Sequence, residues 1–201
     1  MRLRPGCLRA TALSCLLAYA STAPAQDGAP DLSWIDRQAL AAGEVVVQTG
    51  KTAPKVVSVD VAVLIGASAR TIWSVLTSCE IAPEYVPHVA DCTLVETFND
   101  GRSQIFRQTV KPAFFIPAFE HVFRLDYEPF ERIEVSRIGG MIEHMMGSWW
   151  LLERTDGRIL LVHHLEIDPG LPVPRFLVRS ALRRDLPKVL RAVRDRAEAG
   201  A

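Results

Sequence analysis

The stretch EHMMGSWWLLERTDGRILLVHHLEIDPG, residues 143–170, predicts a β-hairpin that turns at TDG. The length of the turn decides which side chains face the protein core. A two-residue turn pairs Trp150 with His163, whereas a three-residue loop with Gly157 left-handed pairs Trp149 with His163. One step of register moves every side chain to the other face of the sheet. The residues alone leave both registers open.

The sequence before this hairpin continues the strand pattern. TLVETF, RSQIFRQTVK, AFEHVFRLDYE and ERIEVSRIGG are separated by the turn signals NDG and EPF. The third segment alternates clearly, with Phe119, His121, Phe123 and Leu125 on one face. Residues 93–168 therefore predict about five consecutive antiparallel strands.

Helices are expected before and after these strands along the chain. Two β-branched runs, residues 44–50 and 55–66, precede a helical pattern with Ser68 as N-cap and a short, proline-broken helical turn at 81–92. After the hairpin, DPGLPVP is irregular because its prolines fix φ and remove backbone donors. Residues 175–200 then predict one long helix. A curved antiparallel sheet around one long helix readily leaves a cavity between them.

The order β-α-α-β(n)-α, with the segments ARTIWSVLTSCEIAPEYVPHV, GSWW and RDLPKVLRAVRDRAE, resembles the START-like helix-grip superfamily (SRPBCC). Within it, the polyketide cyclase/dehydrase and coenzyme Q-binding, lipid-transport-like branch is the most similar. The resemblance covers about residues 55–198 and implies an α+β helix-grip fold. It defines function poorly, because the superfamily includes lipid carriers, hormone receptors, cyclases and dioxygenase subunits.

Residues 1–25 have the pattern of a secretory signal peptide: three Arg, a short apolar run and a small-x-small sequence ending at Ala25. A lipoprotein anchored through Cys15 is disfavoured, because most of the apolar run would follow the modified Cys. We therefore expect an exported, periplasmic protein. Its parts would be the signal peptide 1–25, an N-terminal extension 26–54 with an early strand, and a helix-grip domain 55–201.

Charge is distributed unevenly along the chain. Without residues 1–25 the chain has 20 basic and 23 acidic side chains, but from Arg175 onward it has 8 basic and 3 acidic. Basic side chains do not exceed acidic ones over the chain as a whole, unlike in a typical nucleic-acid-binding protein, so no nucleic acid partner is expected. The basic residues of the last helix suit a solvated helix face. The alternative is transient contact with an anionic membrane surface.

Cysteine and histidine spacing bears on redox chemistry and metals. Cys79 and Cys92 are the two Cys outside the signal peptide, and in an oxidising compartment such a pair predicts a disulfide; two buried free thiols are the alternative. His163 and His164 are adjacent on a strand and point to opposite faces, so they cannot chelate one ion. We expect no metal, no cofactor and no nucleophilic catalytic residue.

The candidate site is the inner wall of the sheet. In the family, the Trp after G-x usually faces the cavity, which favours Trp149 here. The residues expected to line the cavity are Phe106, Gln108, Val110, Phe115, Phe119, His121, Phe123, Ile133, Val135, Arg137, Met145, Trp149, Leu151, Leu161, His163, Leu165, Phe176, Leu177 and Ser180. Ordinary core packing is the alternative for each apolar member, and 111–121 is either a lid or a loop tucked under the helix. The polar members need partners, because burial without one costs a few kcal/mol.

The expected function is binding or transfer, without catalysis, of a hydrophobic small molecule such as a lipid, a quinone or a polyketide-like compound. An enzyme of the polyketide cyclase or aromatase kind is the first alternative, in which a cavity His or Arg would shuttle a proton. A ligand-free interaction module of the same fold is the second.

Overall fold

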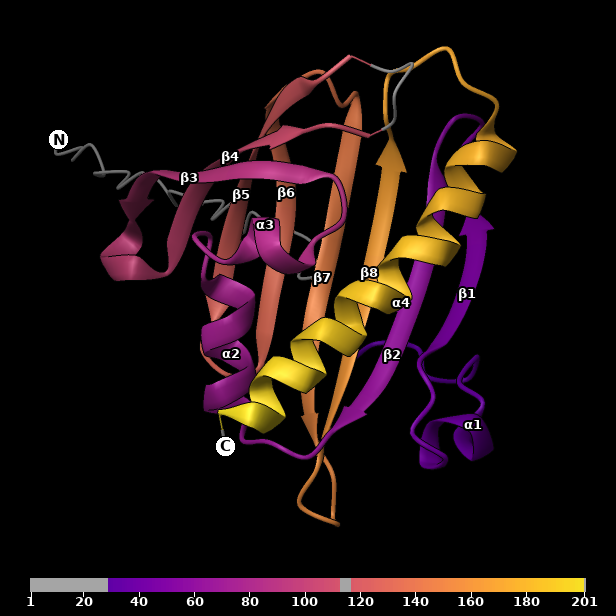
Figure 1. The fold of residues 1–201 in the computed structure, drawn as a ribbon, viewed down its shortest axis with the longest axis vertical. Coiled ribbons are helices and arrows are strands. Elements are labelled where there is room, and N and C mark those ends of the chain that lie inside the picture. Colours follow the sequence, from indigo (N-terminus) through magenta and orange to yellow (C-terminus); the bar gives the residue numbers. More distant parts are fainter. Residues whose placement is uncertain (1–28, 113–116, 201) are drawn as a thin grey trace, which may run out of the picture.

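The computed structural model describes residues 29–112 and 117–200. The predicted signal peptide and Phe115 lie outside these residues. The described strands form one antiparallel sheet in the order β1-β2-β8-β7-β6-β5-β4-β3 (Figure 1). Their bounds are β1 (Val46–Lys51), β2 (Val57–Ile65), β3 (Val89–Phe98), β4 (Ser103–Val110), β5 (Phe119–Glu128), β6 (Arg132–Gly140), β7 (His144–Glu153) and β8 (Ile159–Asp168).

The helices α2 (Ala69–Thr77), α3 (Ala82–Tyr85) and α4 (Arg175–Ala199) lie on one face of the curved sheet (Figure 1). We call this the inner face and the opposite one the outer face. A short helix, α1 (Arg37–Ala41), and a 3-10 turn, η1 (Asn99–Gly101), complete the elements. This is the predicted helix-grip architecture. None of the described helices is both long and apolar enough to cross a membrane.

The hairpin β7–β8 has the register with Trp149 opposite His163. The Arg154 backbone N–H donates to the Arg158 carbonyl oxygen at 2.9 Å, so residues 155–157 form the connecting loop, in which Gly157 has a φ of 79°. The three-residue loop with a left-handed glycine is therefore the one that forms. It sends Trp149 to the inner face and Trp150 to the outer face, where Trp150 packs with Leu160 and Val162.

The strand β2 is buried on both faces, which explains its almost continuous run of β-branched and aliphatic residues. Val59, Val61 and Val63 belong to the inner core beneath α4. On the outer side, Ala62 and Leu64 are covered by Leu40 of α1 and by the residues before it. The edge strand β1 comes from the same N-terminal segment.

The helix α4 begins at the sheet edge beside β1 and crosses diagonally to α2 (Figure 1). Its C-terminal half packs on β2 through Leu190, Val193 and Ala197, all fully buried. The first turns of α4 were predicted to face the inner side of the sheet, and this prediction is wrong. Phe176 is 66% exposed and Leu177 is 48% exposed, and Ser180 is also exposed. The diagonal crossing leaves these turns at the edge, where no strand lies beneath them.

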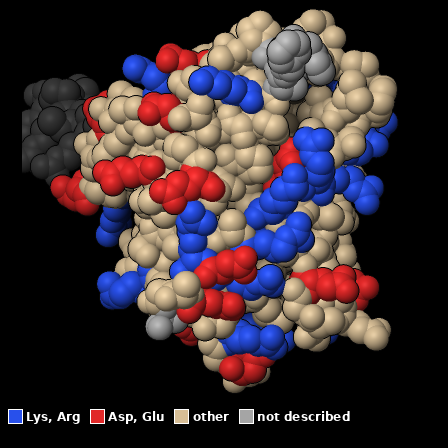
Figure 2. Space-filling view, in the orientation of Figure 1, with Lys and Arg blue, Asp and Glu red and all other residues tan. Residues whose placement is uncertain are grey.

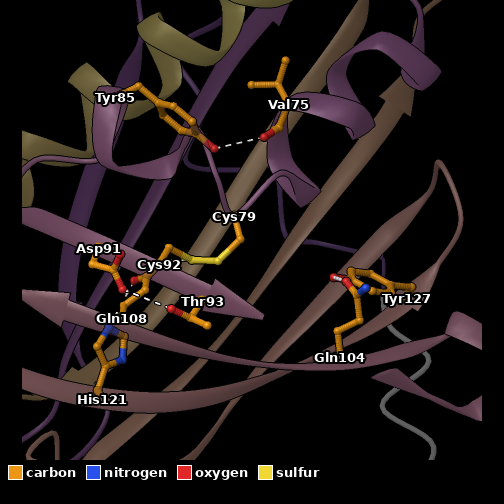
Figure 3. The surroundings of a disulfide bond; sticks show 10 residues. All are labelled: Val75, Cys79, Tyr85, Asp91, Cys92, Thr93, Gln104, Gln108, His121 and Tyr127. Carbon is orange, nitrogen blue, oxygen red and sulfur yellow. Dashed lines mark hydrogen bonds between the residues drawn. A yellow bond between two sulfur atoms is a disulfide. The ribbon is translucent and has the colours of Figure 1, made fainter. Parts of the chain in front are cut away.

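The disulfide Cys79–Cys92 predicted from the sequence is present, with Cα atoms 5.4 Å apart. It joins the end of α2 to β3, so that α3 lies in the closed loop (Figure 3). Ser68 is the N-cap of α2, as predicted, and accepts a hydrogen bond from the Thr71 backbone N–H at 3.1 Å. The helices α2 and α3 are thereby held over β3 and its neighbours.

Candidate functional site

The inner face of the sheet carries two adjoining apolar clusters. The first lies under α4 and contains Leu151 and Leu161, with Trp149 and Leu165 packed against it. The second lies under α2 and the disulfide, and contains Phe106, Phe123, Ile133 and Met145, with Val135 packed against it. Trp149 and Leu165 contact both clusters. The structure thus brings these predicted lining residues onto one surface.

Trp149 and His163 form a stacked pair at the junction of the two clusters. Their ring centroids are 3.7 Å apart and their planes are inclined by 13°. His163 is 4% exposed, and its Nδ1 donates to the Ser148 carbonyl oxygen at 3.1 Å. Burial lowers the pKa of His163 to about 4, so the ring is neutral near pH 7. The partner expected for this buried imidazole is therefore found, at one nitrogen, in the backbone.

A second buried imidazole closes a polar row across β3, β4 and β5 (Figure 3). Gln108 Nε2 donates to Cys92 Sγ at 3.5 Å, and Gln108 Oε1 lies 3.2 Å from His121 Nε2. His121 is 6% exposed, and its other nitrogen, Nδ1, is buried without a hydrogen-bond partner among the residues described. Burial lowers the pKa of His121 to about 4 as well.

Gly140 allows the backbones of β5 and β6 to approach closely at His121. The two residues are paired across β5 and β6, and Gly140 has a φ of 87°. A Cβ at position 140 would lie 2.5 Å from His121 Cα and 2.4 Å from the Glu120 carbonyl oxygen. Only glycine suits this combination of a left-handed backbone and close approach. The GG pair before Met141 in the sequence is the signal for it.

Arg137 was predicted to face the cavity, but its side chain is exposed. It lies opposite Phe123, close to a register shift in the β5–β6 pairing. Its guanidinium donates to the carbonyl oxygens of Ile142 and Gly140. Arg137 therefore binds the turn that follows β6 and does not face the inner side of the sheet. Val110 and Phe119 pair with each other at the strand ends and are half-buried.

A pocket of about 540 Å³ lies at the start of α4, where the sequence pattern predicts none. It is formed by the proline-rich segment 168–173 together with Pro54, Lys55, Glu143, Arg175 and Val178. Charged side chains of both signs border it, and none of the predicted lining residues does. Periodicity in the sequence cannot locate this pocket, because its walls are irregular segments. Its position depends on where the β1–β2 turn meets the start of α4.

The outer face carries a separate polar group. His164 Nδ1 lies 2.6 Å from Asp60 Oδ1, and Glu166 approaches both His164 and His144 at 3.5–3.6 Å. The hydrogen bond with Asp60 raises the pKa of His164. His163 and His164 thus point to opposite faces, as predicted. Within residues 29–112 and 117–200, no three His, Cys, Asp or Glu side chains are grouped as metal ligands.

A curved antiparallel sheet with a long C-terminal helix packed diagonally on its apolar inner face defines a START-like helix-grip protein. The model of the family described as polyketide cyclase/dehydrase and lipid transport matches residues 65–194. The chain belongs to this family. No protein among the curated sequences matches it.

Solved structures of similar fold include proteins of different activities. The Zhui aromatase/cyclase from Streptomyces sp. R1128 is 21% identical with a TM-score of 0.61, over 71% of this chain and 94% of that one. A START superfamily protein from Mycobacterium smegmatis is 21% identical with a TM-score of 0.60, over 79% and 100%. A STAR-related lipid transfer protein fragment from Xanthomonas axonopodis is 15% identical with a TM-score of 0.61, over 74% and 97%. At these identities, the likeness establishes the fold.

Proposed function

We propose that this protein is exported and binds or transfers a hydrophobic small molecule, without catalysis, between the inner face of its sheet and α4. The observation that carries the proposal is a buried imidazole, His121, with an unpartnered nitrogen on an apolar wall. Phe123 stacks on the His121 ring and lies against Phe106, and Trp149 extends the aromatic surface farther along the same face. Covering ~300 Å² of apolar ligand would contribute roughly 7 kcal/mol before ordering costs.

Export is the second part of the proposal. It rests on the signal-peptide pattern of residues 1–25 and agrees with a disulfide between the two remaining cysteines. An oxidising compartment would keep Cys79 and Cys92 joined, and α2 and α3 fixed over the second cluster. A periplasmic carrier of this kind would meet lipids and other apolar compounds at the membranes that enclose the periplasm.

The third part is transient contact with an anionic membrane through α4. Lys and Arg gather in a band that follows this helix (Figure 2). Arg183 and Arg191 are exposed, and neither has an ion-pair partner in the part of the chain that the structure describes. Phe176 and Leu177 add exposed apolar surface at the start of the same helix. Basic charge beside apolar side chains suits a surface of anionic lipid.

Mass spectrometry tests the binding proposal. The full chain is expressed with its leader, purified from the periplasmic fraction, and measured first under native conditions and then after solvent extraction. We expect a co-purifying apolar compound in stoichiometric amount. We also expect the mass of the protein to be that of a chain that begins near residue 26. An empty protein that takes up nothing from an offered lipid extract would contradict the binding proposal, and an uncleaved cytoplasmic chain would contradict export.

Vesicle sedimentation tests the membrane contact. We expect binding to vesicles containing phosphatidylglycerol, weak binding to phosphatidylcholine alone, and release by high salt. The double variant Arg183→Glu, Arg191→Glu should lose binding. Arg107→Glu is the matched control, because Arg107 is exposed on the outer face of β4. Equal binding by both variants would contradict a role for α4.

A further inference from the structure

The disulfide fixes the orientation of the Gln108 amide. A sulfur atom in a disulfide carries no proton and can only accept a hydrogen bond. The Gln108 group 3.5 Å from Cys92 Sγ is therefore the amide nitrogen, and the carbonyl oxygen Oε1 faces His121 (Figure 3). The reverse orientation would place two acceptors against each other at the sulfur.

The orientation of Gln108 in turn fixes the tautomer of His121. Gln108 Oε1 is an acceptor, so His121 Nε2, 3.2 Å away, carries the hydrogen and donates. In a neutral ring the other nitrogen then has a bare lone pair. Burial keeps the ring neutral by lowering the pKa of His121 to about 4. His121 Nδ1 is thus a buried acceptor without a partner among the described residues.

We propose that His121 Nδ1 accepts a hydrogen bond from a hydroxyl group of the bound apolar molecule, and that the site selects alcohols or phenols over the matching ethers and ketones. This inference rests on the proposed binding function and names its ligand class. Among the described residues no group donates to this nitrogen. Phe123 stacks on the His121 ring with the ring centroids 5.2 Å apart, and Gly140, paired with His121 on the adjoining strand, has no side chain.

The selection follows from what each ligand could offer this atom. A hydroxyl donates and removes the cost of a buried, unsatisfied acceptor. The oxygen of a ketone, a quinone or an ether would face the Nδ1 lone pair with another lone pair. A carboxylate would add a buried negative charge to the same mismatch. A site built around an unpaired group rejects an analogue that cannot pair with it.

Calorimetric titration of the mature protein with 2-naphthol, 2-methoxynaphthalene and 2-acetylnaphthalene tests the selection. We expect 2-naphthol to bind about tenfold more tightly than the other two, because a single satisfied hydrogen bond distinguishes them. His121→Phe should bind all three alike. Equal affinities in the unmodified protein, or a preference for the ketone, would overturn the inference and leave the binding proposal intact. Failure of all three to bind would contradict the proposed function itself.

The tautomer can be measured without any ligand. In the ¹⁵N NMR spectrum of the histidine rings, we expect His121 with Nε2 protonated and Nδ1 bare at pH 7. Gln108→Leu should lose this fixed tautomer, whereas the control Gln104→Leu, on the same strand but hydrogen-bonded to Tyr127, should keep it. A protonated Nδ1 in the unmodified protein would overturn the inference even if His121→Phe fails to fold.

Discussion

Single histidines in this protein differ because their surroundings differ. His121 and His163 lie on the inner face, where burial lowers both pKa values to about 4. His164 is the chain neighbour of His163, yet its hydrogen bond with Asp60 on the outer face raises its pKa. The inner histidines are thus neutral hydrogen-bonding groups at pH 7, whereas His164 is suited to carry charge beside two carboxylates.

These shifts predict how stability depends on pH. Between pH 6.5 and about 4, the unfolded chain binds protons at positions 121 and 163 that the folded protein excludes. The free energy of unfolding should therefore fall with acidification, by up to about 1.4 kcal/mol per pH unit for each residue. His164 acts in the opposite direction, because its raised pKa contributes stability at low pH that is lost as pH rises through its folded value.

Urea denaturation at several pH values between 7 and 4.5 measures this dependence. His163→Phe should reduce its slope, because one of the two excluded protons is removed. His164→Gln is the control: it should leave the loss on acidification intact or make it steeper. A free energy of unfolding that is flat over this range would contradict neutral, buried rings at positions 121 and 163.

At the scale of an element, α4 has two unequal halves. Leu190 is fully buried against the sheet, whereas Leu177 is 48% exposed in the same helix. Leu190→Ala should lower the free energy of unfolding by about 2–5 kcal/mol through lost burial and a cavity. Leu177→Ala, the same chemical change, should cost less than about 1 kcal/mol. Denaturant titration of both variants decides, and equal losses would mean that the N-terminal half also packs on the sheet.

The disulfide stabilises another element, α3, because it closes the loop that contains this helix. Replacing both cysteines, Cys79→Ser with Cys92→Ser, should lower the free energy of unfolding by about 3 kcal/mol in the chain-entropy model. Hydrogen exchange should rise in α3, while the backbone of β7 and β8 stays protected. Unchanged exchange in α3 would show that the Tyr85 hydroxyl, which donates to the Val75 carbonyl at 3.1 Å, holds the segment without the disulfide.

At the scale of the whole molecule, the sheet is covered on both faces near β2 and β8. On the outer face, Leu32, Trp34, Ile35 and Leu40 pack against Leu160, Val162 and Trp150. The segment before β1 is therefore part of the packed structure, although it precedes the region of family resemblance. Its docking covers apolar side chains that would otherwise face water.

Two neighbouring substitutions in α1 test this docking. Leu40 is 5% exposed and Ala41 is exposed. Leu40→Asp should lower the midpoint of thermal unfolding and increase binding of an apolar dye, because a charge replaces a buried side chain. Ala41→Asp should change the free energy of unfolding by about 0.5 kcal/mol or less. Similar behaviour of the two variants would mean that α1 contributes no stability to the sheet.

Features that depend on neighbours along the chain could be predicted from the sequence. Alternation of Phe119, His121 and Phe123 predicted the inner row of β5, and Gly157 made the three-residue loop available that places Trp149 inside. The Ser68 cap and the Cys79–Cys92 pair were also foreseeable. Strand period, turn chemistry and capping act over a few residues, so they can be recognised without a fold.

Where these elements meet depends on contacts between distant parts of the chain and could not be predicted in this way. Phe176, Leu177 and Ser180 were predicted to line the cavity, but the angle at which α4 crosses the sheet leaves those three exposed. The exposure of Arg137 and the bare nitrogen of His121 likewise depend on the β6 irregularity and on Gln108 one strand away. Periodicity defines which side of an element is apolar. What that side touches is set by packing between elements far apart in the chain.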